Sequence, residues 1–240
     1  MPSQAPKLSE QPAPPAQEVT AENDAFAARL RGFGPVGIIA AVLVVGLGPV
    51  FEPFGALLAP LWVWRSRTPW RAIGYVRPRS WFRTIVLGIG LGCLFKLLMK
   101  AVVMPLLGAP PINPAFHYLA GNPGALPGMI FTMIAGAGWG EETVFRGFAF
   151  ERLGKLLGTS STAKAATVLL TSIWFGLLHY PVQGLAGAEQ AAIVGLVFGT
   201  IFAITGRLFA LMIAHAAFDL TALAIIYWNV ETRVAHWFFS

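Results

Sequence analysis

The chain has 240 residues, of which 56% are hydrophobic and only 12% are charged. Average soluble domains carry about 25% charged residues, so this chain lacks the polar side chains that would cover a globule in water. Its formal net charge of +6 does not indicate nucleic-acid binding, because the basic residues lie in short segments between apolar runs. The composition therefore predicts a membrane protein with no nucleic-acid partner.

The N-terminal segment differs in composition from the rest of the chain. Residues 1–28 are rich in Pro, Ala, Gln and Glu and show little apolar periodicity, which predicts a disordered tail. They lack the basic stretch followed directly by a short apolar run that marks a cleavable signal peptide. Residues 29–240 are expected to form one transmembrane domain.

The apolar runs after this tail predict an all-α, polytopic bundle of transmembrane helices. Residues 33–64 are apolar apart from Glu52 and are too long for one span, which needs about 20 residues. Glycines and prolines between residues 46 and 53 favour a break there. We therefore expect a hairpin and seven spans in total, or six if residues 33–64 form one span. The seven expected spans are 33–51, 54–64, 84–107, 127–153, 163–180, 189–205 and 208–228.

The positions of the basic residues predict the orientation of these spans. With a cytoplasmic N-terminus, nearly all Lys and Arg of the connections fall on the cytoplasmic side, as the positive-inside rule requires. The loops on the opposite side, around Glu52 and at residues 108–126 and 181–188, contain no Lys or Arg, and only Arg233 in the C-terminal tail departs from the pattern. We expect a multi-pass protein of the cell (inner) membrane. The residues assigned to the cytoplasm are Arg29, Arg31, Arg65, Arg67, Arg71, Arg77, Arg79, Arg83, Arg152, Lys155, Lys164 and Arg207.

Several ionisable side chains fall at membrane depth, where each costs about 2.5 to 17 kcal/mol. Such residues persist where they pair, line a cavity or take part in chemistry. Lys96 and Lys100 have no acidic partner nearby in sequence, so they are expected to snorkel or to face a water-filled region, and a role in substrate binding is open. The others are Glu141, Glu142, Arg146, His179, His215 and Asp219.

The two adjacent glutamates are expected to play different parts. Glu142 and Arg146 are four residues apart and share a helix face, which favours a salt bridge. Glu141 is turned by about 100° from Glu142, so Arg146 cannot serve both carboxylates equally. A carboxylate without a cationic partner in an apolar environment suits a general base.

The two histidines extend this set of carboxylates. A single histidine on a membrane helix is typically an interhelical hydrogen bonder, but His179 and His215 accompany carboxylates on three of the predicted helices. This combination indicates either a water activated by Glu and His or a metal held by His and carboxylate. His179, His215 and Asp219 would form the metal set. No HExxH pattern is present, and the single Cys93 excludes a cysteine-based zinc site.

Three motifs follow one another along the chain. GWGEETVFRGFAF at 138–150 contains an EExxxR pattern that continues with FRG, SIWFGLLH at 172–179 contains FxxxH, and GTIFAITGRLFALMIAHAAFDL at 199–220 contains HxxxD. In this order they resemble the motifs of the CPBP family, also called the CAAX protease or Abi family, the bacterial and archaeal relatives of the type II CAAX prenyl endopeptidase. The segment IGYVRPRSW at 73–81 is similar to a basic stretch of the same family, so the resemblance covers roughly residues 73–228.

The resemblance implies an intramembrane endopeptidase that needs no cofactor. Glu141 and His179 would activate the attacking water, and His215 and Asp219 would stabilise the oxyanion. The eukaryotic pattern typically has Asn at the position of Asp219. An ionised aspartate cannot donate a hydrogen bond, so Asp219 would have to be protonated, orient His215 or bind a metal.

By the same resemblance, Glu142 and Arg146 would brace the site. We expect hydrolysis of a peptide bond in a membrane-associated protein or peptide, with that substrate and the lipid bilayer as partners. Three alternatives stay open. They are a non-catalytic scaffold or immunity protein with the same fold, a zinc-dependent protease, and a transporter with a proton relay, for which the chain shows no internal repeat.

Overall fold

The computed structural model describes residues 15–51 and 53–239. All regular structure in this part of the chain is helical, which confirms the predicted all-α bundle. The helices are α1 Pro15–Arg31, α2 Pro35–Leu47, η1 Gly55–Leu57, α3 Leu58–Ser66, η2 Trp70–Ile73, α4 Trp81–Leu98, η3 Met99–Val103, α5 Met104–Leu106, η4 His117–Leu119, η5 Pro123–Ala125, α6 Leu126–Phe131, η6 Thr132–Ala149, α7 Phe150–Leu157, α8 Ser161–Thr205, α9 Phe209–Tyr227 and α10 Glu231–Ala235.

Helix α1 lies partly in the segment whose composition predicts disorder. It begins at Pro15, so residues 15–28 are helical, whereas residues 1–14 lie outside the described part of the chain. Contacts distant in sequence hold its C-terminal half on α3: the indole of Trp62 donates to the carbonyl of Leu30 at 3.2 Å, and Arg67 pairs with Asp24. Amino-acid composition cannot predict contacts between segments distant in the sequence. The segment 15–28 is therefore helical although its composition predicts disorder.

Helices α2 and α3 correspond to the two limbs of the predicted hairpin at 33–64. They contain 13 and 9 residues, and each is shorter than the about 20 residues that a single span needs. Glu52, where the break was expected, lies outside the described residues. Helix α2 follows α1 after a bend of 60°.

Helices α4 and α9 approach each other through small residues. A Cβ atom on Gly92 would lie 2.1 Å from the carbonyl oxygen of Ala214, and one on Gly88 would lie 2.8 Å from the Cβ of Ile213. Only glycine allows this distance, as in other small-xxx-small contacts of membrane helices. The close pairing brings Lys96 of α4 and Asp219 of α9 to the wall of one cavity.

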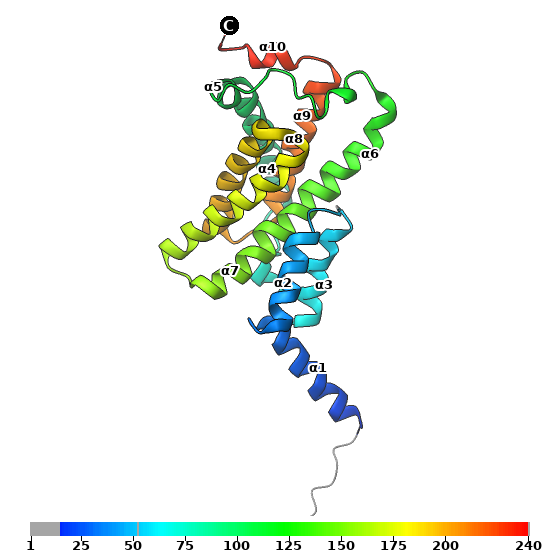
Figure 1. The fold of residues 1–240 in the computed structure, drawn as a ribbon, viewed down its shortest axis with the longest axis vertical. Coiled ribbons are helices and arrows are strands. Elements are labelled where there is room, and N and C mark those ends of the chain that lie inside the picture. The colour runs from blue at the N-terminus through cyan, green and yellow to red at the C-terminus, as the bar shows by residue number, and fades with distance from the viewer. Residues whose placement is uncertain (1–14, 52, 240) are drawn as a thin grey trace, which may run out of the picture.

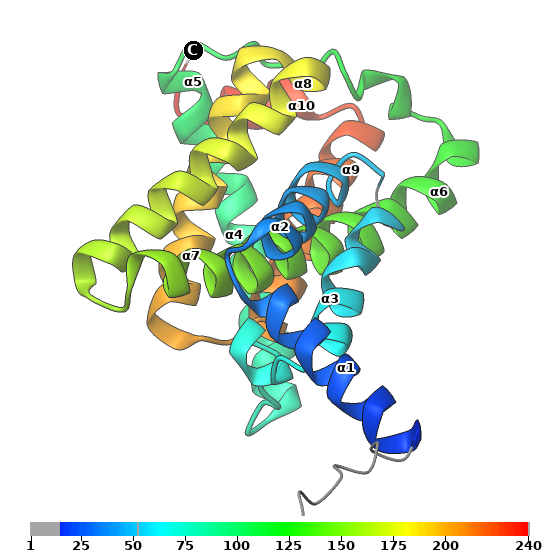
Figure 2. The ribbon, with the colours of Figure 1, turned by 60° about the horizontal axis from the view of Figure 1, so that its bottom comes forward.

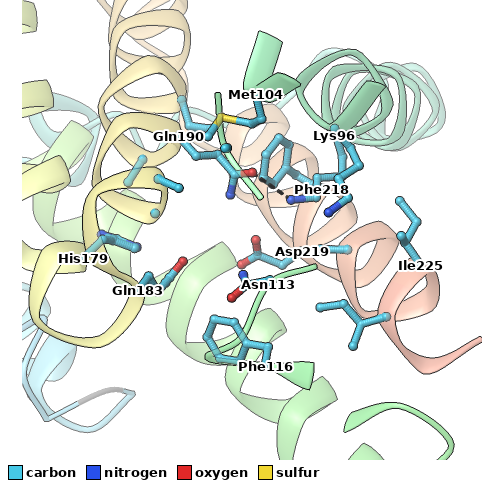
Figure 3. A pocket seen from close by; sticks show the side chains of 18 of the residues that line it. Lys96, Met104, Asn113, Phe116, His179, Gln183, Gln190, Phe218, Asp219 and Ile225 are labelled. Carbon is cyan, nitrogen blue, oxygen red and sulfur yellow. Dashed lines mark hydrogen bonds between the residues drawn. The ribbon is translucent and has the colours of Figure 1, made fainter. Parts of the chain in front are cut away.

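Helix α8 contains two of the predicted spans, folded back on each other. The backbone departs from helical geometry at Gly184, where φ is 64° and ψ is −164°, a conformation that favours glycine. The limbs then run antiparallel in close contact, since a Cβ on Gly195 would lie 2.9 Å from the Cα of Ser172. The turn brings His179 of the first limb near Gln190 of the second, on the same cavity (Figure 3).

The predicted span at 127–153 is divided among α6, η6 and α7. Its central part, η6, has π-type hydrogen bonding and is buried around its whole circumference from Gly140 to Ala149. It crosses the middle of the molecule between α9, α8 and the α2–α3 pair (Figure 2). The acidic pair Glu141 and Glu142 is therefore carried by the central helix.

By length and hydropathy, three helices of the described residues qualify as membrane spans: Trp81–Leu106, Ser161–Thr205 and Phe209–Tyr227. A fourth is added if the bent pair α1–α2 counts as one span. This count is lower than the predicted seven for two reasons. The first is that α8 contains two of the predicted spans. The second is that α2, α3 and the divided helix α6–η6–α7 are too short or too irregular to qualify singly.

The basic connections gather at one end of the bundle. Arg152 of α7 donates to the carbonyls of Arg31 and Gly32 at 2.7 Å each, and the amide of Leu208 donates to Gly74 in the arginine-rich loop at 3.0 Å. Helices α1 and α7 lie at this end, whereas α5, α10 and the turn of α8 lie at the opposite end (Figure 1). The segments assigned to one side from charge alone are thus neighbours in the fold.

Candidate active site

A cavity of about 500 Å³ opens among α4, η6, α9 and both limbs of α8, with α10 and residues 109–116 at its outer rim (Figure 3). Its rim belongs to the end of the bundle that lacks the basic loops. Apolar side chains such as Met104 and Phe218 form much of the wall. Polar groups reach into it from Lys96 at one side and from His179 at another.

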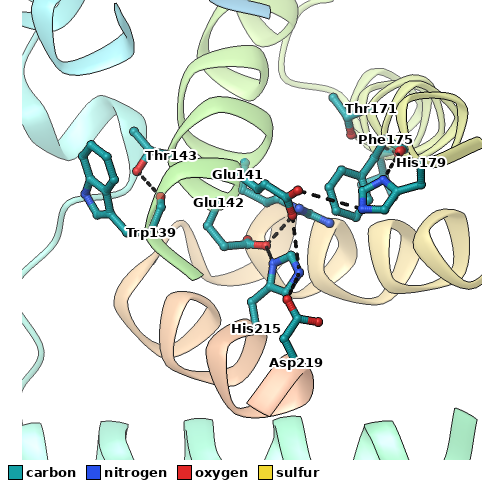
Figure 4. Close-up of polar contacts among 11 residues, drawn as sticks. Trp139, Glu141, Glu142, Thr143, Thr171, Phe175, His179, His215 and Asp219 are labelled. Carbon is teal, nitrogen blue, oxygen red and sulfur yellow. Dashed lines mark hydrogen bonds and ion pairs between the residues drawn. The ribbon is translucent and has the colours of Figure 1, made fainter. Parts of the chain in front are cut away.

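At the base of the cavity, Glu141 faces both histidines (Figure 4). Its Oε2 lies 3.5 Å from Nε2 of His215, and its Oε1 lies 3.9 Å from Nε2 of His179. Asp219 approaches the same nitrogen of His215, with 3.9 Å between Oδ2 and Nε2. The structure thus brings together all four residues that the sequence nominated for chemistry. These separations exceed direct hydrogen-bonding distance and suit groups bridged by a water molecule.

Both imidazoles are held through Nδ1. The Nδ1 of His179 lies 2.8 Å from the carbonyl oxygen of Phe175, and the Nδ1 of His215 lies 2.7 Å from Oε1 of Glu142. Since both partners are acceptors, each Nδ1 carries the proton and donates it. The Nε2 atom of each ring is then left to face Glu141. The two rings, on different helices, are thus oriented in the same way.

The pair Glu142–Arg146 lies behind His215. Oε1 of Glu142 accepts from Nη1 of Arg146 at 2.9 Å, and both side chains are buried, with residue exposures of 0% and 1%. The guanidinium stacks over the ring of Phe175, 4.8 Å from its centroid. The predicted salt bridge is therefore present, and one carboxylate oxygen of Glu142 joins Arg146 to His215.

Several contacts of the cavity could not be read from the sequence. Lys100 pairs with Glu231 of α10 at 3.6 Å, and His117 lies 3.1 Å from the same carboxylate, although Glu231 stands in the expected C-terminal tail. Gln190 accepts from Lys96 at 3.0 Å. The only signal for Gln190 was an uncharged amide inside a predicted span, which sequence reasoning passed over.

The alternative metal set of His179, His215 and Asp219 stays a prediction. Within the described residues, no group of three or more His, Cys, Asp or Glu side chains is arranged to hold a metal ion. Nε2 of His215 lies 3.9 Å from Oδ2 of Asp219. Nε2 of His179 lies 3.9 Å from Oε1 of Glu141, which stands between the two histidines. The orientation of both histidines through Nδ1 is nevertheless one that metal ligands also use.

The protein is a helical membrane protein, and carboxyl and imidazole groups cluster at the base of its cavity. A family model described as type II CAAX prenyl endopeptidase Rce1-like matches residues 123–221, a range that contains all six nominated site residues. No curated protein and no solved structure matches the chain. The family match supports assignment of this chain to the CAAX/CPBP intramembrane proteases. The matched residues are less than half of the chain, and the match supports a protease in general, which would act on a peptide or protein at the membrane.

Proposed function

We propose that the protein is an endopeptidase in which Glu141 and His179 activate water for attack on a peptide bond. The observation that carries the proposal is the position of the Glu141 carboxylate between Nε2 of His179 and Nε2 of His215, at 3.9 and 3.5 Å. A water held between a carboxylate and an imidazole acceptor can lose a proton to either one as it attacks.

Bond formation and proton transfer then balance without a cofactor. The water oxygen bonds to the carbonyl carbon while Glu141 takes the proton, and the same proton passes to the leaving amine as the C–N bond breaks. The oxyanion would be met by Nε2–H of His215. This requires the doubly protonated ring, because Nδ1–H already donates to Glu142. Asp219, on the same side of the ring, would orient His215 or donate in its own protonated form.

Hydrolysis of a defined peptide tests the proposal directly. The purified protein in detergent is incubated with a library of internally quenched, leucine-rich peptides, beside a Glu141→Gln variant. Cleavage by the wild-type chain alone supports the endopeptidase. A folded wild-type protein that cleaves none of the peptides, in detergent or in vesicles, would favour the non-catalytic scaffold.

We also propose that the basic end of the bundle faces the cytoplasm, so the cavity opens on the opposite side of the membrane. In a Cys93→Ser background, an Arg71→Cys variant should be shielded from an impermeant maleimide in intact cells, whereas an Asn122→Cys variant should react. Both positions are exposed, so permeabilised cells should label both and serve as the control. The reverse pattern in intact cells would place the cavity on the cytoplasmic side.

Metal dependence separates the two versions of the mechanism. For water activated by Glu141 and His179, exhaustive chelation should leave the cleavage rate unchanged. An Asp219→Asn variant should keep measurable activity, because asparagine donates to an oxyanion. If chelation abolishes cleavage, added zinc restores it, and the Asp219→Asn protein loses both activity and a bound equivalent of zinc, the protein is a metalloprotease. The zinc would then be held by His179, His215 and Asp219.

A further inference from the structure

Lys96 lies in the membrane-spanning part of α4, and its exposure is only 7%. Its ammonium group reaches the cavity that contains Glu141 and the two histidines (Figure 3). A buried ammonium group at this depth is costly and is found where it pairs or serves the function of the protein. Its partners therefore decide what it does.

The partners of Lys96 leave its charge unbalanced by any direct ion pair. Its Nζ donates to Oε1 of Gln190 at 3.0 Å and lies 4.8 Å from the centroid of the Phe218 ring. Among the described residues, no carboxylate forms an ion pair with it. Asp219, on the same wall, pairs with His215 instead.

Lys100, one helical turn further along the same helix, shows the contrast. It forms an ion pair with the buried Glu231 at 3.6 Å and also donates to the carbonyl of Pro111. Both lysines line the cavity. Lys100 thus links α4 to the outer rim of the cavity, whereas Lys96 lines the cavity and its one hydrogen bond is to the uncharged Gln190.

The part of the cavity wall formed by Lys96 and Gln190 offers hydrogen-bond donors. An ammonium group has three N–H donors, of which one is used by Gln190. The amide NH₂ of Gln190 adds two more, since its oxygen is the atom that accepts from Lys96. The ligand that suits such a corner is an acceptor with negative charge, because charge-assisted hydrogen bonds are the strong ones. Apolar walls from Met104, Phe218 and Ile225 suit the apolar side chains of a peptide.

We propose that Lys96, with Gln190, binds a carboxylate of the substrate peptide and so sets the register in which that peptide crosses Glu141. The proposal rests on the proposed endopeptidase function, since the peptide must occupy the cavity. The carboxylate can come from the free C-terminus or from an acidic side chain of the peptide, and the experiment distinguishes these two sources.

Binding is measured on protein carrying Glu141→Gln, so that no peptide is consumed. A fluorescein-labelled, leucine-rich heptapeptide is used in three forms: a free C-terminal carboxylate, a C-terminal amide, and an amide with one internal glutamate. At least one carboxylate form should bind about 10- to 100-fold more tightly than the neutral amide, as expected for hydrogen bonds to charged groups. The form that binds more tightly identifies the source of the carboxylate.

Three variants in the same background assign the preference to Lys96. Lys96→Met should remove it, Lys96→Arg should retain it, and Lys164→Met, a control at an exposed lysine outside the cavity lining, should leave the ratio of affinities unchanged. Detergent melting shows which variants are folded, and Lys96→Gln replaces Lys96→Met if the latter is not. Equal affinity for all three peptides, no binding at all, or a preference that persists without the lysine would overturn the carboxylate site.

The two proposals fail in different ways. Carboxylate-dependent binding with no cleavage of any bound peptide by the wild-type chain would contradict the endopeptidase and support the binding site. Cleavage at rates that are indifferent to the carboxylate, with Lys96→Met lowering all rates equally, would support the endopeptidase and show that Lys96 has only a structural role.

Discussion

Replacement of Glu141 by glutamine is expected to lower the rate of peptide hydrolysis by about 10²- to 10⁴-fold, the usual contribution of a general base, while the fold is kept. Glutamine has nearly the shape of glutamate but cannot take a proton from water. Glu141 takes part in no short ion pair, since its nearest nitrogens lie 3.5 and 3.9 Å away. Its neutralisation should therefore leave the detergent melting temperature close to that of the wild type.

The matched control is Glu189→Gln, the same chemical change on α8 at a residue outside the cavity lining. Its cleavage rate should equal that of the wild type. A Glu141→Gln protein that cleaves at the wild-type rate would remove this carboxylate from the mechanism. A variant that is inactive only because it melts at a much lower temperature would indicate a structural part for Glu141 instead.

Local spacing in the sequence predicted much of the candidate site. The pairs Glu142–Arg146 and His215–Asp219 are each four residues apart, and helical geometry alone puts both members of a pair on one face. The structure retains both pairs at 2.9 and 3.9 Å. Helical geometry also predicted that Glu141 and Glu142 point in different directions. The carboxylate of Glu141 does face the Nε2 atoms of His179 and His215.

Contacts between distant segments could not be predicted in this way. Lys100 in η3 forms an ion pair with Glu231 in α10. The two residues are far apart in the sequence, so helical spacing does not predict that they meet. The turn at Gly184 is not such a case, because it lies within residues 181–188, which the sequence predicts as the loop between two spans. The uneven distribution of Lys and Arg between the loops could be predicted, because it depends on where the helices end and not on how they pack. The predicted basic segments do lie together in the fold.

Replacement of Arg146 by alanine is expected to destabilise the protein strongly, by about 3 to 5 kcal/mol, the usual effect of removing one partner of a buried ion pair. Glu142, with 0% exposure, would keep only His215 as a partner. The aromatic contact of the guanidinium with Phe175 would be lost as well. Unfolding in mixed micelles, followed by circular dichroism or by protease resistance, measures the change.

Asp24→Ala provides the control, because Asp24 also belongs to an ion pair, with Arg67, but the side chains of this pair are 54% and 53% exposed. An exposed pair of this kind contributes about 0 to 1 kcal/mol, so this variant should unfold close to the wild type. Adding Glu142→Gln to Arg146→Ala should recover part of the lost stability, since no buried charge is then left without its cation. If Arg146→Ala unfolds like the wild type, or the double variant is no more stable than Arg146→Ala, the pair does not brace the site. The position of His215 would then have to depend on Glu142 alone.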